Sequence, residues 1–218
     1  MPVYIYKDNP CIGGLIPSIL SLSMTKFLKS SFWLGIIAGI LLVTLFYISL
    51  ISNITKPVSY AYADDTYHYY FIIKQYINVY QSGNWSSLPN LPMFYGTPNS
   101  LFFLDHHLLQ GTLAIPIYLL THDIIITANI IMVATLYASF LSMYILAWYF
   151  TKSLFPSLLA GIIYLFNPFI SDWVPGYMLL FSLEWVPLII LFFEKSLRRP
   201  TNRNTFLFFL FMILKLSV

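Results

Sequence analysis

Long apolar runs separated by short polar segments dominate this chain of 218 residues. Residues 30–55 and 124–151 contain no Asp, Glu, Lys or Arg. Both runs exceed the roughly 20 residues that an α-helix needs to cross a bilayer. We therefore expect membrane-spanning helices at about residues 30–55, 124–151, 155–170 and 176–193, and the start of a fifth span at 205–218.

The composition supports this interpretation. Hydrophobic residues make up 59% of the chain and charged residues 9%, whereas soluble domains carry about 25% charged residues. The expected fold class is all-α, a polytopic membrane helical bundle. The single cysteine, Cys11, excludes an intrachain disulfide and a cysteine-based metal site. Residues 1–23 contain Pro and Gly without helical periodicity, and we expect a disordered tail or a mis-assigned start there.

The basic residues predict the direction in which the helices cross the membrane. Lys26 and Lys29 precede the first span, Lys152 follows the second, and a basic cluster from Lys195 to Arg203 follows the fourth. If the spans alternate, all these positions lie on one side, and an excess of Lys and Arg marks the cytoplasmic side. The N-terminus is then inside, and residues 56–123 form a large extracytoplasmic loop. We prefer this role for the basic cluster over nucleic-acid binding.

Two helices are expected within that loop. Residues 66–82 combine a polar stripe with an aromatic and aliphatic remainder, which is typical of a helix lying in the membrane interface. The polar stripe consists of Lys74, Asn78, Gln81 and Ser82. Residues 108–120 are apolar but too short to span, so they predict a second interfacial or re-entrant helix, broken by Gly111 and Pro116.

The acidic pair Asp64 and Asp65, followed by His68, is the strongest chemical signal. A carboxylate at the membrane surface can act as a general base or hold a metal that binds a phosphate. If a helix starts here, Asp64 and His68 lie one turn apart and can share a ligand. The alternative is an N-cap, which requires only one Asp. We favour the functional role, because ionisable groups at a membrane are usually functional.

A second cluster, Asp105, His106 and His107, lies between apolar residues later in the loop. Neighbouring carboxylate and imidazole groups suit metal binding or proton transfer. Consecutive histidines point in different directions on most backbones, so we expect only one of them to belong to the site. Polar anchoring at the start of a helix is an equally good explanation.

Two further polar positions are open to either interpretation. Glu184 is expected within the fourth span, where a carboxylate is costly unless it faces a cavity or a partner. It therefore lines a functional cavity or makes a structural hydrogen bond. For His122 and Asp123, just before the second span, we prefer helix capping and interfacial anchoring.

At this point the chain resembles the GT-C superfamily of multi-pass membrane glycosyltransferases, in particular its prokaryotic YfhO-like members. The resemblance covers residues 24–204 and rests on the order of several short motifs. These are Asp64-Asp65 after the first span, the segment Leu104-Asp105-His106-His107-Leu108-Leu109-Gln110-Gly111, the segment from Leu158 to Pro168, and Glu184-Trp185-Val186-Pro187 before a basic turn.

The resemblance implies transfer of a sugar from a polyprenyl-phosphate-linked donor to an acceptor on the extracytoplasmic face. Asp64 or Asp65 is then the general base or metal partner, and His68 and Glu184 contribute to substrate binding. Asp105, His106 and His107 are expected near the lipid phosphate or a divalent metal such as Mg or Mn. Members of the superfamily usually have more spans, so the resemblance implies that this chain is a fragment such as an N-terminal half, the product of a split gene, or a truncated paralogue. A second chain could then complete the bundle.

Two other function classes remain open. The chain could be a non-catalytic membrane subunit, or a degenerate relative, in the assembly or export of polysaccharides or glycolipids. A small ion transporter is less favoured, because transporters place their ionisable residues near the middle of the membrane. Here all the candidates except Glu184 lie in the outer loop.

Overall fold

The computed structural model describes residues 17–57, 63–90, 97–103, 107–166 and 182–217. Side chains are described for these residues except 17–29, 63–66, 102–103 and 182. The segment from 1 to 16, most of the expected tail, lies outside the described residues, and α1 begins at Pro17. The expected tail or mis-assigned start covered residues 1–23, and its last seven residues, 17–23, belong to α1.

Within these ranges the chain is all-helical and contains no strand, as the sequence predicted. The α-helices are α1 (Pro17–Phe46), α2 (Ile48–Ser52), α3 (Ala63–Ser82), α4 (Leu108–Thr121), α5 (Ile124–Thr151), α6 (Leu154–Leu165), α8 (Trp185–Arg198) and α9 (Asn202–Leu216). Three short 3₁₀ turns complete the described elements: η1 (Trp85–Ser87), η2 (Ser100–Phe103) and η4 (Ser182–Glu184).

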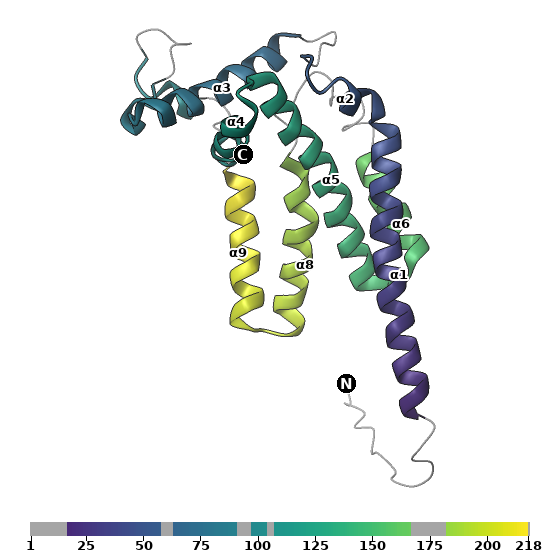
Figure 1. Cartoon of the computed structure of the whole chain (residues 1–218). Coiled ribbons are helices and arrows are strands. Elements are labelled where there is room, and N and C mark those ends of the chain that lie inside the picture. Colours follow the sequence, from purple (N-terminus) through teal and green to yellow (C-terminus); the bar gives the residue numbers. More distant parts are fainter. Residues whose placement is uncertain (1–16, 58–62, 91–96, 104–106, 167–181, 218) are drawn as a thin grey trace.

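The helices form a bundle with a cap. Helices α1, α5, α6, α8 and α9 run roughly side by side, and α3 and α4 lie across one end of them (Figure 1). We call α3 and α4 the helical cap. Helix α5 is central, because it packs against α1, α6 and α8 in the bundle and against both helices of the cap. The turn from α8 to α9 lies at the opposite end from the cap (Figure 1).

Small residues allow α1, α5 and α6 to approach closely. A Cβ atom added at Gly39 would lie 2.0 Å from the Phe140 ring, and one at Gly161 would lie 2.7 Å from the same ring. Gly35 and Gly39 are four residues apart on α1, which is the spacing that brings transmembrane helices into contact. The Tyr144 hydroxyl donates to the Phe32 carbonyl at 2.9 Å and so ties α5 to α1.

The amphipathic pattern predicted for residues 66–82 is confirmed in α3. All four residues of the polar stripe are exposed, and the opposite face is buried. That buried face packs against α4 and α5, so protein rather than lipid covers it. Gly111 of α4 lies against Tyr76, whose ring would be 2.3 Å from an added Cβ atom. The requirement for a small residue at position 111 thus explains how the two cap helices fit together.

The prediction that Gly111 and Pro116 break the second loop helix was wrong. Helix α4 is continuous from Leu108 to Thr121, with Pro116 inside it. A proline removes one backbone hydrogen bond and strains the preceding turn, but tertiary packing can offset that cost. Here the same helix buries Ala114 and Ile115.

Asn129 connects the cap to the segment that follows α2. Its side-chain N–H groups donate to the carbonyls of Ile54 at 2.7 Å and of Lys56 at 2.9 Å. Its side-chain oxygen accepts a hydrogen bond of 3.1 Å from the Tyr70 hydroxyl on α3. Asn129 is fully buried, and these partners compensate for the loss of its hydration.

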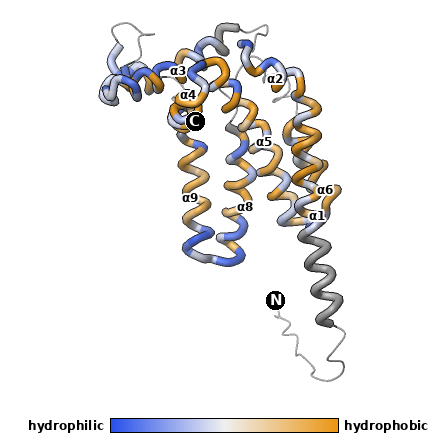
Figure 2. Tube along the Cα trace, in the orientation of Figure 1, coloured by the Kyte–Doolittle hydropathy of each residue, from blue (hydrophilic) through white to orange (hydrophobic). Residues whose placement is uncertain are grey.

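The outward faces of the bundle are apolar. On α1 the exposed stripe contains Trp33, Ile37, Leu41 and Leu45, and on α9 it contains Phe206, Phe209, Ile213 and Leu216. Leu45 is 66% exposed and Leu216 is 72% exposed. Figure 2 shows the hydrophobic colour along the sides of the bundle and the hydrophilic colour at the α8–α9 turn. Soluble monomers rarely expose such continuous apolar stripes.

Among the described residues, one helix is long and apolar enough to cross a membrane by length and composition. It is α5, whose bounds match the predicted span 124–151, and 44% of its most apolar 18-residue window is buried. Two of the other expected spans form shorter helices, α6 with 12 residues and α8 with 14. Helix α1 has 30 residues, and the part of it whose side chains are described, Ser30–Phe46, is apolar but shorter than a span. Residues 176–181 of the expected fourth span lie outside the described residues.

The position of Glu184 differs from the sequence-based expectation. It was expected within the fourth span, but it lies at the N-terminal boundary of α8. Pro187 explains this boundary, because proline has no N–H to bond an upstream carbonyl and is tolerated in the first turn of a helix. Glu184 is therefore at the end of α8 that faces the cap and away from the basic turn.

Candidate functional site

Three buried polar side chains lie where the bundle meets the cap. They are His107, Gln110 and Glu184, with exposed fractions of 0%, 8% and 7%. His107 and Gln110 belong to the start of α4, whereas Glu184 is more than seventy residues later in the chain and precedes α8. Because buried ionisable groups are costly and uncommon, their collection at one junction defines the candidate site.

The backbone at His107 sets the direction of its ring. His107 has φ 46°, in the left-handed region, and stands directly before α4. Its carbonyl accepts a hydrogen bond of 2.7 Å from the Gly111 N–H, which begins the helix. The imidazole then meets the Tyr69 ring edge-on, with the ring centroids 5.7 Å apart and the planes at 88°. Tyr69 is itself buried on the inner face of α3.

Glu184 affects the pKa of the same tyrosine, Tyr69. Burial raises the pKa of the Tyr69 phenol, and the neighbouring acidic groups of Tyr70 and Glu184 raise it further. The phenol therefore stays protonated at any physiological pH and remains available as a hydrogen-bond donor. The turn before Glu184 is held in place by α6, because the Tyr164 hydroxyl donates to the Leu183 carbonyl at 2.8 Å.

Trp185 adds a buried donor beside Glu184. Its indole ring stacks on Phe211 of α9, with the centroids 5.8 Å apart. Its Nε1–H is buried and has no hydrogen-bond acceptor among the described residues. A buried donor of this kind is available to a ligand.

The first turn of α3 brings the acidic pair towards this junction. Helix α3 begins at Ala63, so Asp64 and Asp65 are its second and third residues. Asp65 and Tyr69 are four residues apart and therefore share one face of the helix. Asp64 precedes the half-buried His68 by the same interval. Only the backbone is described for the two acids, and both lie at a helix N-terminus, where the dipole favours negative charge.

The metal site expected from the sequence falls mainly outside the described residues. Asp105 and His106 are not described, and His107 packs against Tyr69. Among the side chains that the structure describes, no three His, Cys, Asp or Glu residues lie close enough together to hold a metal ion. The ligand set for Mg or Mn thus remains a sequence-based prediction.

The capping role preferred for Asp123 is confirmed. One carboxylate oxygen accepts hydrogen bonds from the N–H groups of Ile125 at 2.7 Å and Ile126 at 3.0 Å. His122 ends α4 with φ 53° and donates its N–H to the Tyr118 carbonyl at 2.8 Å. These two residues therefore form the α4–α5 corner.

The structure thus brings His107 and Glu184 to the same residue, Tyr69 of α3. It also adds Tyr69 and Gln110, which the sequence analysis did not select. Tyr69 was one of several aromatic residues in the amphipathic helix expected at 66–82, and nothing in the sequence distinguished it from the others. Gln110 had one: it is an amide within an otherwise apolar segment, and such a residue needs a partner when buried.

Comparisons with known proteins give no relative from which a function could be transferred. The chain matches no protein-family model, no curated protein and no solved structure.

Proposed function

We propose that the chain is a multi-pass membrane glycosyltransferase, or its N-terminal half, with the helical cap on the extracytoplasmic face. It would transfer a sugar from a polyprenyl-phosphate-linked donor to an acceptor at that face. The observation that carries the proposal is the convergence of buried Glu184 and His107 on Tyr69, beside the α3 turn that bears Asp64 and Asp65.

Two features support the membrane location. The exposed apolar stripes of α1 and α9 suit contact with lipid tails. The basic residues after α5 and α8 gather at the end away from the cap, as expected for a cytoplasmic side. A lipid-linked donor reaches its enzyme along the bilayer, so a site where the bundle meets the cap would be accessible to it.

The residues supply the groups that sugar transfer needs. A carboxylate of Asp64 or Asp65 would accept the proton of an acceptor hydroxyl while that oxygen bonds to the anomeric carbon. The bond from the anomeric carbon to the phosphate oxygen breaks, and polyprenyl phosphate leaves with its electron pair. Donors at the junction, such as the Tyr69 phenol and the Trp185 indole, would bind phosphate or sugar oxygens. A divalent Mg or Mn ion held by the acidic residues would, when bound, neutralise phosphate charge.

A non-catalytic membrane subunit is the second candidate, and α9 favours it. Among the described elements, α9 packs extensively only against α8. Phe206, Phe209 and Ile213 are left exposed along its outer face. A second chain that covers this face would complete the bundle, and the chain would then assist polysaccharide or glycolipid assembly.

The topology can be tested with single cysteines. Cys11 is the only native cysteine, so Cys11→Ser gives a silent background. In intact cells Asn84→Cys, beyond α3, should react with a membrane-impermeant maleimide, whereas Asn202→Cys, at the α8–α9 turn, should react only after permeabilisation. Both positions are exposed. The reverse pattern would contradict the proposed orientation, and reaction at both positions in intact cells would contradict the membrane crossing.

The activity can be tested by release of polyprenyl phosphate from radiolabelled polyprenyl-phosphate mannose or glucose in membranes that contain the protein. Asp64→Asn, Asp65→Asn and Glu184→Gln are compared with Asp123→Asn and Glu194→Gln. Asn also caps helices well, so Asp123→Asn is a matched control for the aspartates. Loss of the general base should lower the rate by about 100-fold or more. Unchanged transfer in both Asp64→Asn and Asp65→Asn would remove the general-base role.

The two histidines with left-handed backbones provide a second matched pair. Asn tolerates this conformation well, so His107→Asn and His122→Asn impose the same backbone cost. We expect sugar transfer to fall in His107→Asn and to be retained in His122→Asn. Equal losses in both would indicate a structural role and favour the subunit hypothesis.

A further inference from the structure

The end of the bundle opposite the cap carries a strongly basic cavity. Its volume is about 520 Å³, and it lies between the end of α5 and the α8–α9 turn. The lining residues are Tyr149, Lys152, Lys195, Arg198, Arg199, Arg203 and Asn204. Five of these seven are cations and none is an acid. The hydrophilic turn at this end is visible in Figure 2.

A second, apolar cavity adjoins the first. It has a volume of about 360 Å³ and is formed by Phe32 of α1, Ile145 and Trp148 of α5, and Leu191 of α8. Tyr149, Lys152 and Lys195 line both cavities. An elongated amphiphile could therefore place a charged head in the basic cavity and a hydrocarbon chain in the apolar one.

The cations are held close together. The Lys152 and Lys195 ammonium groups lie 5.2 Å and 5.3 Å from the centre of the same Tyr149 ring. Lys195 also lies 4.7 Å from the centre of the Phe192 ring. Burial lowers the pKa of Lys195, which lies two residues beyond the expected span, and the charges of Lys152 and Arg203 lower it further. A bound anion would relieve this repulsion.

The turn that carries these cations is fixed by hydrogen bonds. The buried Asn204 side chain donates to the Arg199 carbonyl at 3.0 Å and to the Lys195 carbonyl at 3.4 Å. The Thr201 hydroxyl accepts from the Asn204 N–H at 3.2 Å and begins α9. The one acid beside the cluster, Glu194, is paired with Arg198. The remaining cations are therefore arranged in advance for a ligand, which lowers the entropic cost of binding.

We infer that these joined cavities bind an anionic phospholipid of the inner leaflet, with its phosphate among Lys152, Lys195 and Arg203 and an acyl chain between α1, α5 and α8. The basic residues would then do more than orient the chain in the membrane. This inference rests on the proposed membrane location but not on sugar transfer. A lipid is preferred to a soluble phosphate because the apolar cavity shares Tyr149, Lys152 and Lys195 with the basic one.

The test uses the purified full chain in detergent and phosphatidylglycerol brominated in its acyl chains. Bromine quenches nearby indoles, and Trp148 lines the apolar cavity. We expect saturable quenching that is lost in Trp148→Phe. Brominated phosphatidylcholine, which has no net charge, should quench much more weakly. Equal quenching by both lipids would overturn the inference.

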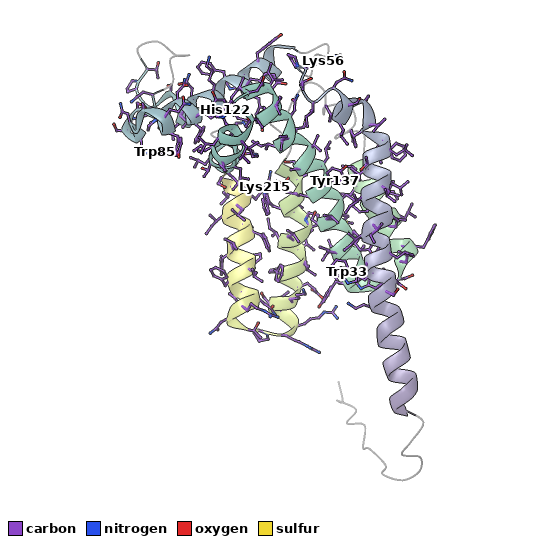
Figure 3. All side chains as sticks on the ribbon, viewed as in Figure 1. Trp33, Lys56, Trp85, His122, Tyr137 and Lys215 are labelled. Carbon is purple, nitrogen blue, oxygen red and sulfur yellow. The ribbon has the colours of Figure 1, made fainter. Side chains whose placement is uncertain are left out.

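Matched variants separate a built site from general attraction to charge. Lys195→Met keeps an unbranched stem but removes a cation, and should weaken binding about tenfold or more, because hydrogen bonds to charged groups contribute strongly. The control is Lys215→Met, which removes a cation near the cap end of α9 (Figure 3). Equal weakening in both variants would contradict a specific site. Arg203→Gln repeats the test from α9 if Lys195→Met fails to fold.

Competition distinguishes the lipid from a free phosphate. Inorganic phosphate should displace the brominated lipid poorly, and a short-chain phosphatidylglycerol should be intermediate. Ile145→Phe, which adds bulk in the apolar cavity without adding an indole, should weaken binding of the long-chain lipid and leave the short-chain one unaffected. Displacement by inorganic phosphate as effective as that by the long-chain lipid would show a soluble-anion site and overturn the proposal.

Discussion

The imidazole of His107 and the phenol ring of Tyr69 meet edge-on, with centroids 5.7 Å apart, although they come from different helices of the cap. Both side chains are buried. Glu184 enters the same junction from the start of α8 and raises the pKa of Tyr69 in addition to the effect of burial. Tyr69 and Glu184 thus connect α3 of the cap to the start of α8.

Tyr69→Phe is expected to separate chemistry from packing at this junction. The change keeps the ring that packs against His107 and removes only the hydroxyl donor. Thermal stability should change little, whereas sugar transfer should fall about tenfold or more, as expected for a lost hydrogen bond to a charged group. Tyr67→Phe is the control, because Tyr67 is on the same helix but 60% exposed. Equal activity of the two variants would argue against a role for the phenol.

Asn129→Ala is expected to loosen the link between α5, the segment that follows α2, and α3. It removes the donors to Ile54 and Lys56 and the acceptor of the Tyr70 hydroxyl. Leaving buried partners unsatisfied costs about 1–3 kcal/mol. We expect a lower unfolding temperature and faster hydrogen exchange of the Lys56 backbone amide, which donates to the Asn53 carbonyl at the cap end (Figure 3). Asn78→Ala, at an exposed position on α3, should leave both unchanged.

Gly39→Ala is expected to disrupt the contact between α1 and α5. An added Cβ atom would lie 2.0 Å from Phe140, so the helices must separate, at a cost of about 1–3 kcal/mol for overpacking. The unfolding temperature in detergent should fall. Leu41→Ala, on the exposed face of α1, should have a much smaller effect. A neutral or stabilising effect of Gly39→Ala would contradict the close approach of the two helices.

Lys195 predicts a pH dependence of lipid binding. Its ammonium faces Lys152 and Tyr149 of α5 and Arg203 of α9, with Arg198, Arg199 and Glu194 on its own helix. Because its pKa lies below the usual 10.5, it loses its charge at a lower pH than a free lysine side chain does. Binding of phosphatidylglycerol should therefore weaken as the pH rises through that lowered pKa. The step should be absent in Lys195→Met and retained in Lys215→Met.

The same shift predicts how Lys195 affects stability without lipid. Because the pKa of Lys195 is lower in the folded chain than in the unfolded chain, protonation of Lys195 favours the unfolded chain. The folded chain is therefore more stable above pH 10.5, where Lys195 is neutral in both states, and loses this stability as the pH falls through the lowered pKa. At neutral pH the charged Lys195 is therefore unfavourable in the free protein. Lys195→Met should raise the unfolding temperature of the lipid-free chain and abolish the further rise caused by phosphatidylglycerol.

Much of the fold follows from patterns that are local in the sequence. The uncharged run 124–151 determines α5, and the Asp123 carboxylate caps its first turn. The polar stripe of α3 appears at the predicted spacing because helical period and burial on one side are properties of the segment itself. The apolar runs and the basic segments between them can likewise be identified without information about residues elsewhere in the chain.

The pairing of distant side chains was decided only by the tertiary structure. His107 and Glu184 converge because α4 packs against α3, with Gly111 against Tyr76, and because Pro187 places Glu184 at the start of its helix. Lys152 and Lys195 share one tyrosine ring because the end of α5 lies beside the last turn of α8. No local pattern encodes such contacts, since they depend on which helix faces fit together with small residues and rings. The sequence therefore determined the helices and the distribution of apolar and basic residues along them, and packing decided which polar residues meet.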